Sequence, residues 1–118
     1  MMWQILPLTE DPWQVFTTDI FIDGESIHAQ VEFRYLPSPD RWYVSIWDHA
    51  AGKLLVNQIP LVCSYGEIND LLKPVRFLRE GRGIGSLFCL KAIDAPDTQD
   101  PAGNNILQFQ VLWGDTYG

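Results

Sequence analysis

The stretch VFTTDIFIDGESIHAQVEFRYL (residues 15–36) decides the fold. Asp23-Gly24 separates two apolar runs and favours a type I′ turn, in which both central residues need positive φ. The stretch therefore predicts an antiparallel hairpin that pairs residues 15–22 with residues 26–36. In the second strand apolar and polar residues alternate, which is typical of a strand with one buried face. The apolar positions are Ile27, Ala29, Val31, Phe33 and Tyr35.

More strands follow this hairpin. RWYVSIWDHAAGKLLV (residues 41–56) predicts a second hairpin, because its side chains alternate up to position 47 and Gly52 suits a turn with left-handed geometry. Pro60 implies that the returning strand lies at an edge or carries a bulge, since proline has no N–H to donate. Two later runs, SLFCLKAI (residues 86–93) and ILQFQVLW (residues 106–113), also read as strands.

One short helix is predicted near residues 65–73. Ser64 and Glu67 form a capping box, and Pro74 would end the helix. The whole chain, residues 1–118, is expected to be a single all-β domain of about seven short antiparallel strands. Either a small β-barrel or a two-sheet sandwich would satisfy this pattern. We favour the barrel, because closure removes exposed sheet edges.

Composition narrows the classes of function. The 118 residues carry a formal net charge of −7, which disfavours specific nucleic-acid binding and docking on anionic membranes. No apolar run reaches the roughly 18 residues of a membrane-spanning helix. The first residues do not resemble a signal peptide. Cys63 and Cys89 lie among apolar residues, so we expect buried reduced thiols rather than a disulfide, and synthesis in a reducing cytoplasm.

No arrangement of residues in the sequence predicts catalysis. His28 lies on the polar face of a strand and His49 in a turn, and both are interpreted as solvated side chains. GRGIGS (residues 81–86) resembles a phosphate-binding loop, but its third glycine comes one residue early and a strand follows it instead of a helix. We therefore expect no catalytic residue, no cofactor, no metal and no enzymatic activity.

Two groups of residues are candidates for a protein–protein interface. Tyr43 and Trp47 alternate away from the buried side of their strand, and large rings on an outer face often mark a contact surface. The second group is the basic segment (residues 73–82), which holds half of the chain's eight basic residues. Such a patch suits an acidic partner, although ion pairs with the nearby Asp70 or Glu80 would explain it equally well. Its candidate contact residues are Arg76, Arg79 and Arg82.

Several motifs together resemble a known family. ILPLTEDPWQVFTTDI (residues 5–20), RWYVSIWDHAAGKLLVNQIPLV (residues 41–62), the pair Leu71-Leu72 and the glycine before SLFCL (residues 86–90) follow one another as in the baseplate plug family of contractile-tailed bacteriophages, known from a cyanophage. The resemblance covers about residues 5–92.

The resemblance implies a structural virion protein without catalysis. Such plugs sit in three copies at the centre of the baseplate, where hub proteins hold them above the central spike and they close the tail tube lumen until ejection. The partners would be hub and spike proteins and copies of the chain itself. The chain would be found in the virion, and in the host cytoplasm during assembly. The residues alone leave an alternative open, a small ligand- or peptide-binding β-barrel that uses the face of Tyr43 and Trp47.

Overall fold

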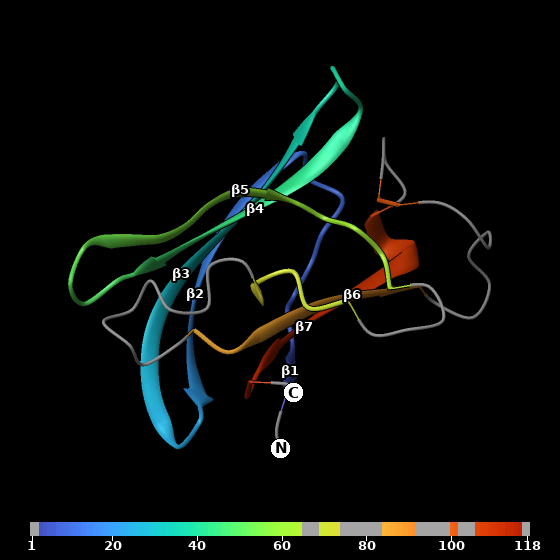
Figure 1. Ribbon diagram of the computed structural model, residues 1–118. Helices are drawn as coiled ribbons and strands as arrows, with labels where there is room; N and C mark the ends of the chain where they lie inside the picture. Colours follow the sequence, from blue (N-terminus) through green and yellow to red (C-terminus); the bar gives the residue numbers. More distant parts are fainter. Residues whose placement is uncertain (1–2, 65–68, 74–83, 92–99, 102–105, 117–118) are drawn as a thin grey trace.

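The computed structural model describes residues 3–64, 69–73, 84–91, 100–101 and 106–116. These residues form two antiparallel sheets, one with the strand order β1-β7-β6 and one with the order β2-β3-β4-β5 (Figure 1). The elements are β1 (Trp3–Ile5), β2 (Trp13–Ile22), β3 (Glu25–Leu36), β4 (Arg41–Asp48), β5 (Lys53–Pro60), β6 (Ser86–Lys91), a 3-10 turn, η2 (Ile106–Gln108), and β7 (Phe109–Gly114).

The hairpin of β2 and β3 confirms the sequence prediction. Pairing runs from Ile22 opposite Glu25 to Trp13 opposite Arg34. The turn residues have φ values of 51° at Asp23 and 83° at Gly24, so both have the positive φ that a type I′ turn requires. The pairing is in register along all of β2, because the hydrophobic side of β3 must face the core and a shift by one residue would turn it outward.

The second hairpin is also as predicted. Gly52 has a φ of 63° in its turn, and β5 forms one edge of the four-stranded sheet. The pairing of β4 and β5 is irregular between Val44 and Ile46. There the backbone N–H of Gln58 donates to Ser45 Oγ at 2.9 Å in place of a ladder bond. Pro60 is therefore tolerated for both reasons that the sequence offered, an edge strand and a bulge.

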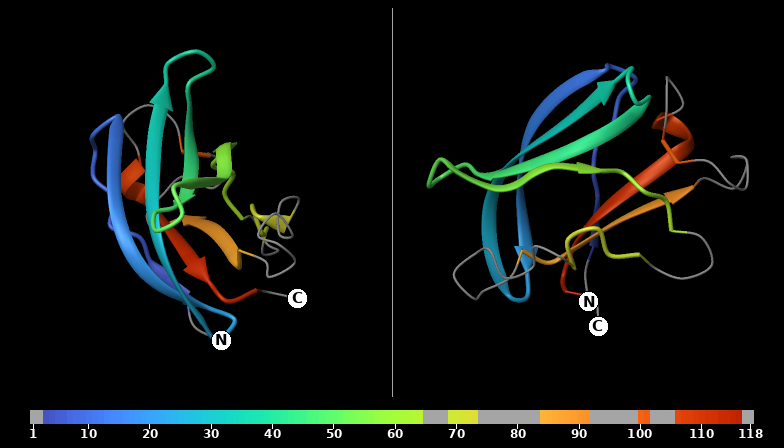
Figure 2. Two further views of the ribbon diagram at one scale, coloured as in Figure 1. Left: turned by 90° about the vertical axis from the view of Figure 1, so that its left-hand side faces the viewer. Right: turned by 45° about the horizontal axis from the view of Figure 1, so that its top comes forward.

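The core lies between the two sheets, and the four-stranded sheet curls around it (Figure 2). The buried Trp113 illustrates how polar groups in this core are satisfied, since its indole N–H donates to the Ile84 carbonyl at 2.8 Å. Aromatic and aliphatic side chains from both sheets fill the interior without solvent contact, among them Phe33, Trp42, Val44, Ile46, Leu87 and Val111.

The two sheets approach each other along two seams that differ in kind. At the first seam the chain continues past β5, and Cys63 pairs with Cys89 of β6 in a parallel bridge. At the second seam β1 and β2 share no backbone pairing, and a side-chain hydrogen bond from Gln4 Nε2 to Thr18 Oγ1 (2.9 Å) connects them. The sheets are thus not closed, and our preference for a barrel was wrong. A three-residue strand such as β1 is too short to complete the ladder along the ten residues of β2.

In the described part of the helix predicted near residues 65–73, residues 69–73, the structure has no α-helix but a turn, in which the Lys73 N–H donates to the Asp70 carbonyl at 3.3 Å and Lys73 has 3-10 geometry; residues 65–68 lie outside the described residues. Leu71 donates its backbone N–H to the Leu87 carbonyl at 2.9 Å, which ties this segment to β6 in place of a helical bond. Ser64 Oγ accepts from the Asn69 N–H at 2.9 Å. The helical content of the described residues is thus close to nil. A separate difference from the sequence prediction is strand β1, which was not expected.

The structure explains why position 85, in the GRGIGS motif, is a glycine. Its φ is +77°, and a Cβ atom there would lie 2.0 Å from the carbonyl oxygen of Gly114 and 2.9 Å from Ile22 Cγ2. Glycine is therefore needed where the start of β6 passes close to the end of β7. A strand follows the motif, as predicted, and not the helix that a dinucleotide-binding loop would require.

Candidate protein–protein interface

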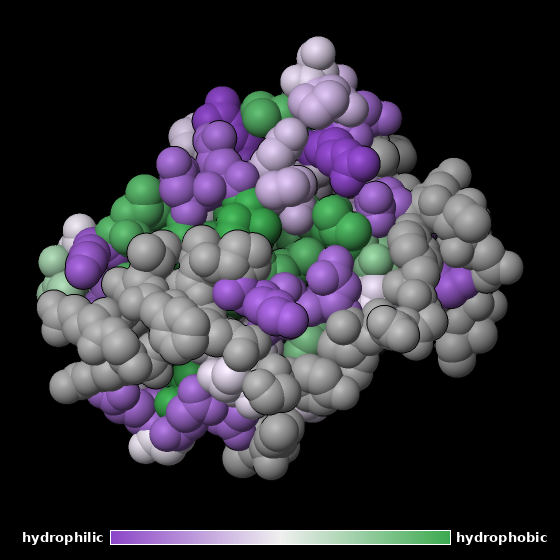
Figure 3. Space-filling model, in the orientation of Figure 1, coloured by the Kyte–Doolittle hydropathy of each residue, from purple (hydrophilic) through white to green (hydrophobic). Residues whose placement is uncertain are grey.

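The four-stranded sheet has large apolar side chains on the side that faces away from the core. We call this surface the aromatic face. Strand alternation and cross-strand pairing place its members on one side of the sheet. On the side of the molecule seen in Figure 3, hydrophobic atoms reach the surface along β5. The aromatic face consists of Trp13, Val15 and Phe21 on β2, Tyr43 and Trp47 on β4, and Leu54 on β5.

The rings of β2 are the most exposed part of the aromatic face. Trp13 is 62% exposed and Phe21 64%, although both belong to a regular strand. β2 is the edge strand of its sheet, so these side chains border an edge without backbone pairing in the described residues. These residues were not among the interface residues predicted from the sequence. The alternation of β2 could have identified them, because Trp13, Val15 and Phe21 all point away from the side chains that enter the core.

Tyr43 and Trp47 point away from the core, as predicted, but they are half-buried and not fully exposed. Trp47 lies opposite Gln30 of β3 and Leu54 of β5, and Ser45 between the two rings is buried. Cross-strand neighbours thus cover part of each ring. They leave part of the ring area at the surface.

The indole N–H of Trp47 differs from those of Trp3 and Trp13 in its hydrogen bonding. Trp3 donates to the Asp115 carbonyl and Trp13 to Glu32 Oε2, each at 2.8 Å. Among the described residues, no acceptor for the Trp47 indole N–H is found. A half-buried tryptophan with an available donor is suited to a partner surface, because a contact there would bury the ring and satisfy the N–H.

Polar side chains surround the rings of β2. The guanidinium carbon of Arg34 lies 5.7 Å from the centre of the Trp13 ring, within range of a cation–π contact. Glu32 accepts the Trp13 indole N–H. The ring is therefore held in one orientation by a cation and a carboxylate from β3, which lowers the entropy cost of docking a partner on it.

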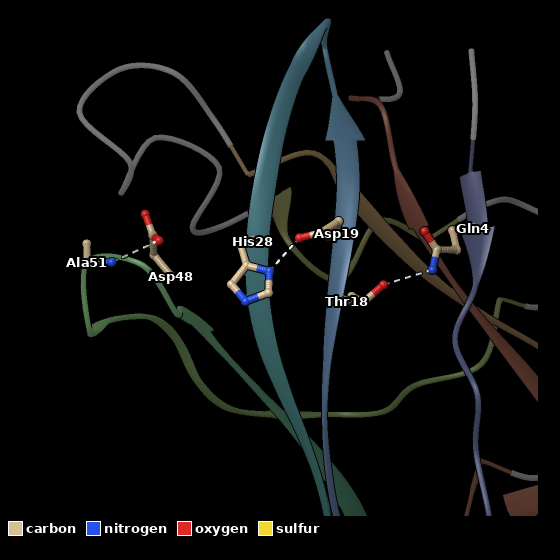
Figure 4. A network of polar contacts seen from close by, with 6 residues as sticks. All are labelled: Gln4, Thr18, Asp19, His28, Asp48 and Ala51. Atoms are coloured by element: carbon tan, nitrogen blue, oxygen red, sulfur yellow. Dashed lines mark hydrogen bonds and ion pairs between the residues drawn. The ribbon is translucent and has the colours of Figure 1, made fainter.

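Two histidines meet at the far end of the same sheet. His28 of β3 bonds to Asp19 of β2 through its Nδ1 atom, and Figure 4 shows the two side chains pointing toward each other. The ring of His49 lies 5.0 Å from that of His28 at an interplanar angle of 66°. Both histidines are exposed, as the sequence indicated, but their rings contact each other and are not solvated separately. Within the described residues no group of three or more His, Cys, Asp or Glu side chains could hold a metal ion.

The candidate residues Arg76, Arg79 and Arg82 lie outside the described residues. The flanks of the basic segment are described, and Asp70 joins them. Its carboxylate accepts from the Leu72 N–H (3.0 Å) on one flank, and from Ser86 Oγ (2.8 Å) and the Leu87 N–H (3.2 Å) on the other. The two described flanks of the segment are thus held together at the start of β6.

A small cavity lies between the two unpaired edges. It has a volume of about 140 Å³ and is lined by Trp3 and Gln4 of β1 and by Asp19, Ile20 and Phe21 of β2. Pockets that bind small molecules have volumes of roughly 300–1,000 Å³. The cavity matches the size of one apolar side chain better than that of a metabolite.

An all-β domain with rings on the outer side of a sheet has the character of a module that packs against other proteins. A family model described as "Cyanophage baseplate Pam3 plug gp18" matches residues 2–116. The chain therefore belongs to this family of phage baseplate plug proteins, a family of structural proteins of the virion tail that associate with other baseplate proteins. The match extends well beyond the residues that carried the resemblance. No curated protein matches the chain.

No helix in the described parts of the chain is long and apolar enough to cross a bilayer.

Proposed function

We propose that this chain plugs the centre of the baseplate of a contractile tail, where hub proteins hold it above the central spike. Three copies around the tail axis close the tube lumen until ejection, and the chain has no catalytic role. It assembles in the host cytoplasm and leaves the cell in the virion. The family match over residues 2–116 carries this proposal. The aromatic face supports it, because a plug acts by contacts with its neighbours alone.

The aromatic face is the surface through which the plug contacts its neighbours. Tyr43 and Trp47 lie at its centre, between the exposed rings of β2 and Leu54 of β5. Tryptophan and tyrosine dominate binding energy at interfaces, because they bury a large area at little cost in side-chain entropy. In this arrangement the half-buried rings supply affinity, and the polar groups of β3 around them supply orientation.

The basic segment forms a second contact. On a chain of net charge −7, Arg76, Arg79 and Arg82 concentrate positive charge between two flanks that Asp70 holds together. Guanidinium groups bind carboxylates in a bidentate fashion and lose little hydration on docking. We expect these three residues to contact an acidic surface of a hub protein or of a neighbouring copy.

The alternative, a ligand- or peptide-binding β-barrel, has less support. The sheets do not close into a barrel, and the cavity between β1 and β2, at about 140 Å³, is smaller than typical ligand pockets.

Locating the chain in purified baseplates tests the proposed function. The gene would be deleted from its phage, and the chain supplied from a plasmid with a tag that electron microscopy can detect. We expect three tags at the central opening of the tube, and premature loss of tube contents from particles assembled without the chain. A tag at the periphery of the baseplate, or normal retention of DNA in the deletion, would contradict the proposal.

A further inference from the structure

Cys63 and Cys89 face each other across the first seam between the two sheets. They are partners in a parallel bridge, and the Ser64 N–H next to Cys63 donates to the Cys89 carbonyl at 2.8 Å. Paired strands lie about 4.8 Å apart. A disulfide requires a Cα–Cα distance of roughly 4.4–6.8 Å. The backbone at this bridge therefore already meets the distance requirement for a disulfide.

The side chains also meet the directional requirement. Both belong to the buried core, with exposed fractions of 2% for Cys63 and 0% for Cys89. Partners in a parallel bridge project to the same side of the sheet, so both thiols enter the interior together. The Cys63 thiol lies close enough to raise the pKa of the Cys89 thiol, and Cys63 Sγ donates to the Ser64 carbonyl at 3.7 Å. A disulfide could form here without a large movement of either strand.

The backbone on the Cys63 side is held in place by charged groups. The Cys63 N–H donates to Asp100 Oδ1 at 2.9 Å, and Asp100 Oδ2 lies 3.2 Å from Arg41 Nη1. Arg41 opens β4, so this link connects the seam to the middle of the four-stranded sheet. Both cysteines are free thiols in this structure.

We propose that Cys63 and Cys89 are a modification site, at which a small-molecule disulfide such as oxidised glutathione converts the two thiols into an internal disulfide. The bond would form after the protein leaves the reducing cytoplasm in the virion, and it would lock the seam between the sheets. This timing rests on the proposed function, whereas the chemistry rests on the bridge alone.

The reaction proceeds by two thiol–disulfide exchanges. The thiolate of one cysteine attacks a sulfur of the oxidant, forming a mixed disulfide and releasing one thiolate of the oxidant. The second cysteine then attacks the protein sulfur of that mixed disulfide and displaces the other thiolate. The two thiol protons end on the two released thiols. The cysteines are oxidised by two electrons, and the oxidant's S–S bond is reduced.

Burial makes this reaction slow in the closed fold. Burial raises the pKa of the Cys89 thiol far above its usual range, and the neighbouring Cys63 and Asp100 raise the pKa further. The attacking species is the thiolate, so a protonated thiol in the core does not react. Oxidation therefore requires a local opening of the seam, and the site would stay reduced during short exposures to an oxidant.

The disulfide would reinforce one of the two seams between the sheets. Among the described residues, β6 contacts the chain that leaves β5 through this bridge, the adjoining Ser64 bond and the bond from the Leu71 N–H to the Leu87 carbonyl. The link would also enclose the basic segment, because residues 73–82 lie between the two cysteines. A cross-link stabilises mainly by restricting the unfolded chain, and the effect grows with the length of the enclosed loop.

Intact-mass and thermal measurements on the purified full chain test the proposal. The protein would be incubated with oxidised glutathione at neutral pH, both in buffer and in urea below the unfolding midpoint. We expect the loss of two hydrogen atoms per chain, no thiol left to label after denaturation, and faster reaction in urea. The melting temperature should rise by about 5–15 °C. Dithiothreitol should restore the original mass and melting temperature.

Cys63→Ala and Cys89→Ala serve as matched controls. Each leaves one thiol, so neither should lose two hydrogen atoms or gain thermal stability under the oxidant. The comparison of oxidised and reduced wild type stands even if a variant folds poorly. Two thiols that persist in the folded protein, under conditions that oxidise the urea-unfolded chain completely, would overturn the proposal. So would a disulfide between two chains, or a bond that lowers the melting temperature. None of these results depends on where the chain sits in a baseplate.

Discussion

Strands β2 and β3 pair along the whole of β2, but their outer faces differ. β3 is polar on that side, with His28, Gln30, Glu32 and Arg34, and its inner side chains from Ile27 to Phe33 are almost completely buried. This is the usual pattern of a strand with one side in the core and the other in water. For β3, the requirements of folding explain both faces.

β2 carries large apolar side chains on both sides. Its inner residues Ile20 and Ile22 are buried, while Trp13, Val15 and Phe21 on the outer side are about half or more exposed. Exposed edge strands usually carry several charges that prevent association with other strands. β2 carries one charged residue, Asp19. Since the core does not need the outer rings of β2, the difference between the strands supports the proposal that β2 contacts another protein.

The largest expected effect comes from comparing one residue type on the two strands. Phe33 of β3 is fully buried and stacks on Phe16 with ring centres 6.1 Å apart. Phe33→Ala should lower the free energy of unfolding by about 3–5 kcal/mol, because it removes a buried ring and leaves a cavity. Phe21→Ala on β2 should change the free energy by less than about 0.5 kcal/mol, since Phe21 is mostly in solvent. Urea unfolding measures both values.

The same pair should reverse its order in an assembly experiment. Among folded variants, Phe21→Ala should reduce incorporation into particles, although its stability is that of the wild type. Equal stability loss for the two phenylalanines would show that the outer side of β2 is part of the core. Normal incorporation of Phe21→Ala would remove β2 from the interface.

Trp47 extends the comparison to β4. Because part of the Trp47 ring lies at the surface, Trp47→Ala should lower the free energy of unfolding of the isolated chain less than Phe33→Ala does. Its binding to a purified hub protein should weaken by about 2 kcal/mol or more, which is roughly a thirtyfold loss of affinity. Gln30→Ala, which changes the polar neighbour of Trp47 on β3, is the matched control. An unfolded Trp47→Ala variant would assign the ring to the core.

The sequence predicted the first hairpin well because local chemistry determines it. Asp23-Gly24 fixes the turn, and the alternation from Ile27 to Phe33 fixes the register, since a shift by one residue would expose the whole apolar set. The edge position of Pro60 followed from its missing N–H. Each of these conclusions depends on residues that are close together in the chain.

Features that depend on distant parts of the chain were missed. β1 has three residues, and it becomes a strand because Trp3 pairs with Gly114 near the other end of the chain. The described part of the helix predicted near residues 65–73 is a turn and not an α-helix, and there Leu71 bonds to Leu87 of β6. Whether the sheets close depends on how edges meet in space, which periodicity does not report.

The candidate interface shows the same limit. Alternation correctly placed Tyr43 and Trp47 on the outer side of β4, but it overestimated their exposure, since it does not account for coverage by cross-strand neighbours. It overlooked the rings of β2, because an edge position is a property of the sheet and not of the strand. The pairing of Cys63 with Cys89 was equally invisible, as 26 positions separate them.

The basic segment should have a smaller effect per residue than the rings. Replacing Arg76, Arg79 and Arg82 with glutamine should weaken binding to a hub protein at low ionic strength, by about 0.2–1 kcal/mol for each arginine. The difference from wild type should shrink at high salt, because salt screens exposed charges. Lys53→Gln, at the first position of β5, is a single-charge control that should change binding little. Unchanged binding of the triple variant at both salt concentrations would leave the segment as a solvated part of the surface.

The smallest expected effect concerns the single charge on β2. Asp19 and His28 form a hydrogen-bonded pair with 75% and 45% of their side chains exposed. Pairs this exposed contribute about 0–1 kcal/mol, so Asp19→Asn should shift the melting temperature by no more than a few degrees. Removing the charge also makes the outer side of β2 entirely uncharged, and we expect weak self-association of the purified chain at high concentration. Thr17→Asn, at the preceding outer position, is the matched control. Analytical ultracentrifugation across a concentration series measures this self-association. If Asp19→Asn stays as monodisperse as wild type and Thr17→Asn, the charge of Asp19 does not prevent association at this edge. The contrast between β2 and β3 would then be one of apolar area alone.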